Sequence, residues 1–371
     1  MNKRPLVVAL YLPQYYETEY NNQWWENGYT EWTALRRAKP LYPGHYQPRI
    51  PLNNNYYDLS DKKNIKWQMD LAKKYGIDGF AIYQYYSCGK KLLEVPTELI
   101  RDNQDLDLPF FLYWANESWR KAWFGQDNTI VWKQEYGTKE DWKKQFDYCC
   151  SYFKDERYIK IDGKPLYAIY NPWAIPNGFL DAWDNWAKEN GFPGIFFIKN
   201  IGSHDLYSLG KYSARITREP VYTMVKDESL IEKIIRITES RSIDCINKNI
   251  LFKFNRGIIK SRKSYDAVWR KILNRKNVDS ETIIGCFCDW DNSPRKSYNS
   301  LIMNDANPQK FFEFFKRLMK KTIDAGSPMI VINAWNEWAE GAYLEPDQKH
   351  GFAYLEAINK VQKQFSEDGL E

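Results

Sequence analysis

Short apolar runs alternate with amphipathic segments along most of the chain. Eight runs rich in β-branched and aromatic residues predict buried strands, and several intervening segments repeat apolar residues at helical spacing. The expected strands are residues 7–11, 79–85, 110–114, 165–170, 195–198, 214–217, 283–288 and 329–332, the sixth weakened by Arg215. The expected helices are residues 62–75, 96–101, 139–153, 178–190 and 308–325.

This eightfold alternation predicts an α/β fold, a single TIM-type (β/α)8 barrel with long βα loops that spans residues 1–371. The loops that follow the strands form the active face of such a barrel. Two segments depart from the alternation. Residues 15–57 are rich in aromatic residues and proline and predict an ordered functional loop, whereas residues 225–276 are basic and predict an irregular insertion.

Composition narrows the classes of function. Aromatic residues make up 17% of the chain, including 16 Trp and 27 Tyr, more than a core needs, and sugar-binding clefts use such rings for stacking. The 53 basic residues are nearly matched by 48 acidic ones, which does not indicate a nucleic-acid partner. The basic insertion indicates either a solvated face or a contact with phosphate, from a lipid carrier or a membrane surface.

Other sequence signals predict location and chemistry. Six cysteines lack disulfide or zinc spacing, which favours reduced thiols in the cytoplasm. We find no signal peptide and no run near 18 apolar residues, so we expect a soluble cytoplasmic protein, with peripheral membrane contact left open. Three scattered histidines, and no glycine-rich turn after the first strand, predict neither a metal nor a cofactor.

The candidate chemistry follows the last expected strand. Residues 329–332 lead directly to Glu337 and Glu340, which are surrounded by tryptophans. Glycosidic bond chemistry uses two carboxyl groups, one to protonate the leaving oxygen and one to act at the sugar. A solvated helix face often shows the same spacing, but seldom with such aromatic neighbours. We therefore predict that Glu337 and Glu340 are catalytic.

Aromatic and polar residues at the other strand ends are candidates for substrate binding. Asn116 and Glu117 have an equally good structural interpretation, as hydrogen-bond partners of the next loop. Asp289 and Asp291 resemble the Asp-x-Asp of one glycosyltransferase class, a weak signal. The substrate-binding candidates are Tyr11, Gln14, Trp25, Glu31, Trp32, Tyr83, Gln84, Trp114, Asn116, Glu117, Trp119, Tyr170, Trp290, Asp291, Trp335, Asn336 and Trp338.

Residues 336–341 read N-E-W-A-E-G and resemble the N-E-W-x-E-G motif of glycoside hydrolase family 99-like proteins. The closer match is their WbsX branch, which occurs with genes for bacterial surface polysaccharides and is often labelled glycosyltransferase. Further similarity lies in Y-L-P-Q-Y at 11–15, W-A-N-E-S-W at 114–119 with G-Q-D-N at 125–128, and W-D-N-S-P-R at 290–295. The resemblance thus covers almost the whole chain.

The resemblance implies a mechanism. In family 99 the first Glu of the motif, here Glu337, is the base for the sugar's own 2-hydroxyl, which attacks the anomeric carbon to give an anhydro-sugar. The second, here Glu340, protonates the leaving group, and configuration is retained. WbsX-like chains tend to have His where this chain has Tyr16 and Gln84, and Trp where it has Tyr86, which puts the substrate in question.

Together these features predict an enzyme acting on glycosidic bonds of a surface polysaccharide, such as O-antigen or capsule, or of its lipid-linked precursor. Two alternatives remain open: a glycosyltransferase that uses an activated sugar donor, and a polysaccharide-binding barrel without catalysis. We expect both carboxylates in one pocket at the strand ends. We also expect aromatic burial and the neighbouring carboxylate to raise the pKa of Glu340.

Overall fold

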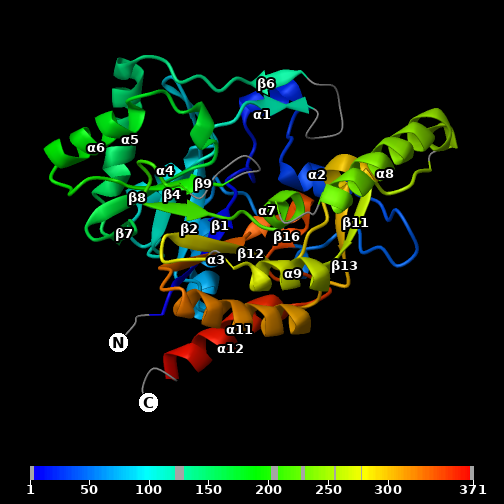
Figure 1. Ribbon diagram of the computed structural model, residues 1–371. Coiled ribbons are helices and arrows are strands. Elements are labelled where there is room, and N and C mark those ends of the chain that lie inside the picture. The colour runs from blue at the N-terminus through cyan, green and yellow to red at the C-terminus, as the bar shows by residue number, and fades with distance from the viewer. Residues whose placement is uncertain are drawn as a thin grey trace.

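Eight parallel strands close on themselves in the computed structural model, which describes residues 4–121, 129–201, 208–226, 230–254, 256–276 and 278–367. Around the ring the order is β1, β14, β12, β10, β9, β8, β4 and β2, and β2 pairs again with β1 (Figure 1). The predicted (β/α)8 barrel is therefore confirmed. Its strands are β1 Leu6–Tyr11, β2 Gly79–Ser87, β4 Phe110–Trp114, β8 Lys164–Ile169, β9 Phe196–Asn200, β10 Ala214–Ile216, β12 Thr282–Phe287 and β14 Met329–Asn333.

The barrel strands are buried on both faces, as parallel strands covered by helices must be. Every residue of β14 is buried, and Ile330 lies opposite Val7 on one side and Ile284 on the other. The weakly predicted sixth strand also forms. Its interrupting residue, Arg215, is buried and forms an ion pair with Asp279, which explains how a charged residue is tolerated there.

Helices cover the outside of the barrel. Several begin at the side-chain caps that helix starts favour: Asp61 accepts a hydrogen bond from the Lys63 amide, and Asn307 from that of Lys310. Helices α11 and α12 lie side by side in this layer, at the bottom of Figure 1. The covering helices are α3 Lys62–Lys74, α4 Val95–Asp102, α5 Lys139–Phe153, α6 Phe179–Glu189, α7 Val221–Lys226, α9 Tyr265–Asn274, α11 Pro308–Asp324 and α12 Ala353–Glu367.

The long segment after β1 contains short helices that the sequence pattern did not predict. They are α1 Glu19–Trp24, α2 Glu31–Arg37 and the 3₁₀ helix η1 Leu52–Asn54. The indole of Trp32 in α2 lies 4.6 Å from the Tyr15 ring and 5.7 Å from the Trp338 ring. This segment therefore packs directly against the loop that follows β14.

Residues 225–276 differ from the irregular insertion that we expected. Helix α8, Leu230–Asn249, extends away from the barrel, followed by β11, Ser261–Ser264, and α9 (Figure 1). Apolar residues recur along α8 at helical spacing, but many of them are exposed to solvent. The helix therefore lacks the clear division into an apolar and a polar face by which a sequence pattern reveals a helix.

Shorter elements complete the described chain: β3 Lys90–Leu92, β5 Trp119–Arg120, β6 Ile130–Trp132, β7 Lys160–Ile161, β13 Leu301–Asn304, β15 Asn336–Glu337, β16 Ala342–Tyr343, α10 Ser293–Lys296, η3 Pro172–Ala174, η4 Leu251–Phe254, η5 Ser297–Asn299 and η6 Trp338–Glu340.

Candidate active site

The two candidate glutamates lie on a tight loop at the carboxyl end of β14. The chain passes through β15, η6 and β16, and Gly341 makes the turn with a φ of 64°. A Cβ atom at Gly341 would lie 2.8 Å from the Asp291 amide nitrogen, so glycine is required there. Glu337 precedes the 3₁₀ helix η6 directly, and Glu340 ends it just before this turn.

Arg295, from α10, lies at the centre of the site. Its Nη1 is 2.7 Å from Glu340 Oε1, its Nη2 is 3.4 Å from Glu337 Oε2, and its Nε donates to Glu31 Oε1 at 2.8 Å. Glu337 and Glu340 thus converge on one guanidinium, and neither lies on the outer wall of the barrel. Arg295 belongs to the W-D-N-S-P-R stretch, but nothing in that stretch marks it as a site residue.

The electrostatics separate the two glutamates. Burial and the neighbouring charge of Glu340 raise the pKa of Glu337 to about 8, although Arg295 opposes the shift. We expected the raised pKa on Glu340, whereas the structure gives it to Glu337. The side chain of Glu337 is only 5% exposed against 17% for Glu340, and its contact with Arg295 is the longer one.

The raised pKa predicts how stability depends on pH. The folded protein binds a proton at Glu337 that the unfolded chain releases above about pH 4.3, so this group makes stability fall as pH rises from there towards 8. Glu337→Gln should remove that contribution. In urea unfolding from pH 5 to 8, the variant should gain stability relative to wild type as pH rises. The exposed Glu356→Gln should run parallel to wild type, and parallel curves for Glu337→Gln would contradict the assignment.

Aromatic side chains, which include Tyr83 and Tyr170, form a wall beside Glu337 and Glu340, together with a second arginine. Arg218, just after β10, donates from Nη1 to the Tyr170 hydroxyl at 2.8 Å, and its charge lowers the pKa of Glu337. Burial raises the pKa of Glu117, and Arg218 opposes this shift too. The buried Tyr83 hydroxyl has no hydrogen-bond partner among the described residues. The pair is therefore bordered by a second cation and by a buried hydroxyl with unused hydrogen-bonding capacity.

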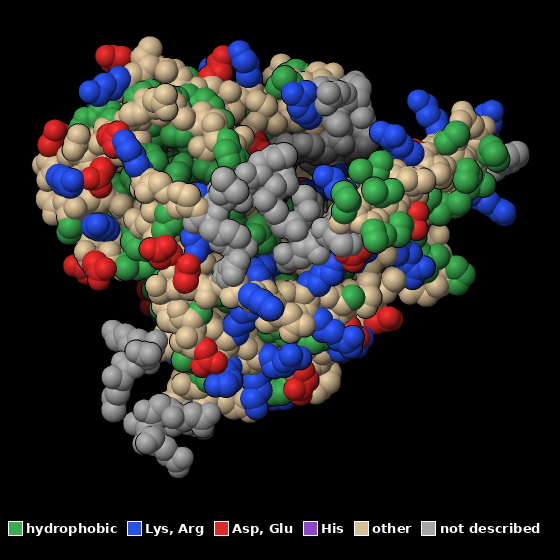
Figure 2. Space-filling view, viewed as in Figure 1, with side chains coloured by type: hydrophobic (Ala, Val, Ile, Leu, Met, Phe, Trp, Pro, Cys, Tyr) green, Lys and Arg blue, Asp and Glu red, His purple; other side chains and the backbone are tan. Residues whose placement is uncertain are grey.

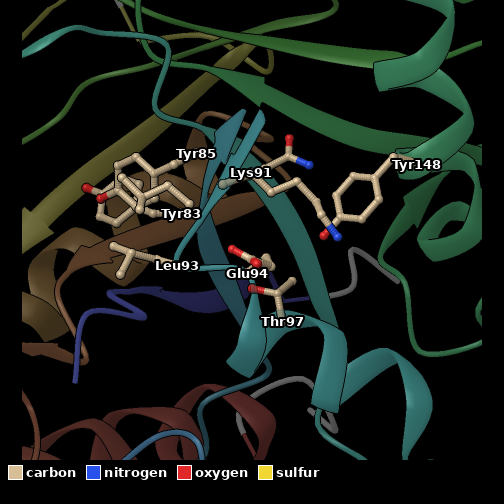
Figure 3. Close-up of a pocket in the computed structure, with 9 residues that line it drawn as sticks. Tyr83, Tyr85, Lys91, Leu93, Glu94, Thr97 and Tyr148 are labelled. Atoms are coloured by element: carbon tan, nitrogen blue, oxygen red, sulfur yellow. The ribbon is translucent and has the colours of Figure 1, made fainter. Parts of the chain in front are cut away.

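A small cavity lies behind this wall. Figure 3 shows Tyr83 and Tyr85 together on one side and Tyr148 on the other, with Glu94 and Thr97 at the base. Its volume is about 10 Å³, which is room for roughly one water. A sugar ring cannot enter it, so a glycan would have to approach the outer side of the wall.

Several predicted binding residues hold in place the loop that carries Glu337 and Glu340. The Asn336 side chain accepts from the Leu12 amide at 2.8 Å and donates to the Leu12 carbonyl at 2.9 Å, which ties the β14 and β1 loops together. Trp338 Nε1 donates to Glu345 at 2.6 Å. Tyr11 donates to Gln68, which donates to Glu345 in turn. Tyr11, Asn336, Trp338 and the fully buried Trp335 therefore form the floor beneath the site.

Other predicted residues point away from the pair. Gln84 contacts Cys149 of α5, at 3.2 Å, and accepts from the Tyr167 hydroxyl at 2.8 Å. Trp114 donates to the Tyr86 carbonyl and stacks on Phe179 of α6. Both side chains lie between the barrel and its helices. The structure does not bring them together with Glu337 and Glu340.

Asn116 forms hydrogen bonds to the next loop, which was the structural interpretation of this residue. Its side chain donates to the Asn171 carbonyl at 2.8 Å and accepts from the Asn171 amide at 2.7 Å, so it joins two strand-end loops. Trp119 packs edge-on against Tyr85, with ring centroids 4.9 Å apart, and extends the aromatic wall. Trp25 is half-buried beside Tyr29, and Gln14 is buried. The matching stretch at 125–128 lies outside the described residues.

Asp291 belongs to a neighbouring polar cavity of about 260 Å³. Its carboxylate accepts from His45 at 2.8 Å, from Gln47 at 2.7 Å and from the Ser293 amide at 3.0 Å. Burial alone would raise its pKa, but these bonds and the charge of Arg49 lower it to about 2. Arg49 also pairs with Asp289. Both carboxylates of the Asp-x-Asp, with buried Trp290 between them, thus anchor the 42–49 loop.

Solved structures of other proteins share this fold. The GH99 endo-alpha-mannosidase from Bacteroides thetaiotaomicron is 12% identical, covers 98% of each chain and has a TM-score of 0.52. A structure named glycoside hydrolase-like protein is 13% identical, covers 97% of this chain and 94% of its own, and has a TM-score of 0.57. At such identity the similarity shows a shared fold.

Comparison with curated sequences gives closer relatives. A protein named Uncharacterized protein WxcX, from Xanthomonas campestris pv. campestris, is 30% identical over 363 residues, and its counterpart in a second strain is 30% identical over 367. Each match covers 96% of this chain and 49% of the relative, so the chain spans about half the length of these relatives. The family model described as Glycosyltransferase WbsX matches residues 7–358, and the chain therefore belongs to that family.

Proposed function

We propose that this protein is a carbohydrate-active enzyme that breaks glycosidic bonds in a bacterial surface polysaccharide or its lipid-linked precursor. Membership of the WbsX family and the barrel shared with GH99 structures support carbohydrate chemistry. The observation that carries the proposal is the convergence of Glu337 and Glu340 on Arg295, with the pKa of Glu337 raised. One proton on a pair of carboxyl groups is what acid and base catalysis at a glycosidic bond requires.

The reaction would proceed through the sugar itself. Glu337, in its carboxylate form, takes the proton of the 2-hydroxyl, whose oxygen attacks the anomeric carbon. Glu340 gives a proton to the departing glycosidic oxygen, and water then opens the anhydro-sugar with overall retention. Because the resting pair holds its proton on Glu337, that proton must move to Glu340 when a glycan binds, and Arg295, which contacts both groups, stabilises the charge on either one.

The family description favours a second candidate, a glycosyltransferase that uses an activated sugar donor. Such an enzyme would need a site for the donor's phosphates. The Asp-x-Asp carboxylates that could hold a metal and a sugar nucleotide are instead engaged by Arg49, His45 and Gln47. We therefore place bond cleavage first and transfer second, ahead of a barrel that only binds polysaccharide.

Thermal unfolding with added ligands separates the two candidates. A ligand that binds only the folded protein raises the melting temperature by mass action. We expect oligosaccharides from surface polysaccharides to raise it, and sugar nucleotides to leave it unchanged. The shift should shrink in a Tyr83→Phe variant, which loses the unused hydroxyl but keeps the ring. A rise in melting temperature with a sugar nucleotide, and none with any glycan, would favour the glycosyltransferase over the enzyme that cleaves glycosidic bonds.

A further inference from the structure

Apolar side chains gather on the surface of the arm formed by α8 and the residues that follow it. Of the twelve large hydrophobic side chains exposed in the described residues, nine lie between positions 230 and 258. Leu230 is 74% exposed, Ile231 70%, Ile234 56% and Ile235 49%. Figure 2 shows this cluster on the arm that projects at the right of the molecule, with Lys and Arg side chains around it. A soluble surface rarely leaves such a patch without a partner.

The spacing along α8 combines these apolar residues with positive charge. Leu230, Ile234 and Ile237 lie on one stripe because they recur every three or four residues, and Arg241 and Lys248 continue the same stripe. Both cations are exposed, and neither forms an ion pair with a described residue. Between residues 230 and 263 the sequence has nine Lys and Arg against three Asp and Glu.

Other side chains of α8 hold the helix to the segment that follows it and to the body of the protein. Asn247 is fully buried; its side chain donates to the Ile258 carbonyl at 2.8 Å and accepts from the Ile258 amide at 2.7 Å. Asp244 pairs with Lys260, and Glu232 pairs with Lys271 of α9. Two of the three acidic side chains therefore form ion pairs, and the third, Glu239, is exposed one turn after Ile235, so the outer face is apolar with basic residues in excess.

We propose that this outer face docks on the surface of an anionic lipid bilayer. Isoleucine and leucine side chains would enter the boundary between headgroups and acyl chains, while Arg241 and Lys248 would meet the anionic headgroups. A second copy of the chain would bring the same positive charges to the contact, which disfavours self-association. No described helix is both long and apolar enough to cross a membrane. The proposal rests on this surface and stands apart from the catalytic assignment.

Flotation with vesicles tests the proposal. The intact chain should float with phosphatidylcholine vesicles that contain phosphatidylglycerol, and much less with phosphatidylcholine alone. The double variant Ile234→Ser/Ile235→Ser should lower the vesicle partition coefficient at least about tenfold. Arg241→Glu/Lys248→Glu should lower it about tenfold or more on the anionic vesicles only. Circular dichroism checks that each variant keeps its helix content.

Two control variants match these changes elsewhere on the surface. Trp173→Ser removes a side chain that is 53% exposed outside the arm, and Lys320→Glu reverses an exposed charge on α11. Both should float like the unchanged protein. Failure of the unchanged protein to bind anionic vesicles, or equal loss in the controls, would overturn the proposal. So would a stable dimer in solution that Ile234→Ser/Ile235→Ser converts to monomer, because the face would then be covered by a second copy.

Discussion

Glu340→Gln should lower turnover of a natural glycan by about 10²- to 10⁴-fold, the usual loss when general-acid help is removed. Glutamine keeps the shape of the side chain but cannot donate the proton that the leaving oxygen needs. An aryl glycoside, whose leaving group departs without protonation, should be affected much less. Glu337→Gln should damage both substrates, because activation of the attacking hydroxyl is needed in either case. The measurement is kcat/KM for each variant on both substrate types.

The comparison of the two substrates decides which glutamate holds the proton in the complex. If Glu337 is the acid, as its raised pKa in the resting site would suggest, then Glu337→Gln will be the variant that an aryl leaving group rescues. Glu356→Gln is the control, because this exposed glutamate lies on α12. Equal failure of both variants on every leaving group would show that the division of roles is wrong.

Arg295→Met should destabilise the protein by about 3 to 5 kcal/mol, because it leaves Glu31, Glu337 and Glu340 together without their shared cation. The loss should be largest near pH 8 and shrink towards pH 4. Without Arg295 the pKa values of Glu31 and Glu337 would rise further in the folded state, and below their ordinary values both states are protonated. Urea unfolding at several pH values measures the effect.

A matched control is available on the surface. Arg37 pairs with Glu26 at 2.6 Å, but both side chains are well exposed, so Arg37→Met should cost no more than about 1 kcal/mol. Arg295→Lys keeps the charge without the planar fork and should fall between wild type and Arg295→Met. A cost for Arg295→Met as small as that of Arg37→Met would contradict the central role of this guanidinium.

The barrel could be predicted because its strands leave a local signal. Runs such as 329–332 are continuously apolar and β-branched, and they end in polar residues at the active face. Because these strands are buried on both faces, the sequence does not show which of their side chains point into the barrel. Tyr83 reaches the site while its neighbour Gln84 faces α5, and nothing in a strand buried on both faces distinguishes them. We therefore predicted both Gln84 and Tyr83 as site residues, and Gln84 lies outside the site.

The charges of the site were harder to predict. Arg295 lies 42 residues before Glu337 and Arg218 far earlier, and only the closed barrel brings them to the pair. From the sequence we predicted a raised pKa for Glu340, but the structure has it at Glu337. The sequence could not indicate this, because the outcome depends on the deeper burial of Glu337 and on the shorter contact of Glu340 with Arg295.

A structure of the Glu340→Gln variant with a bound oligosaccharide, chosen by its thermal shift, tests the central claim most directly. We predict a glycosidic oxygen within about 2.6 to 3.2 Å of the substituted side chain at position 340, and the sugar's 2-hydroxyl at the same distance from Glu337. Product analysis with the wild-type enzyme should then show retained configuration. A glycan bound elsewhere, or one held here with a water between Glu337 and the anomeric carbon, would contradict the account.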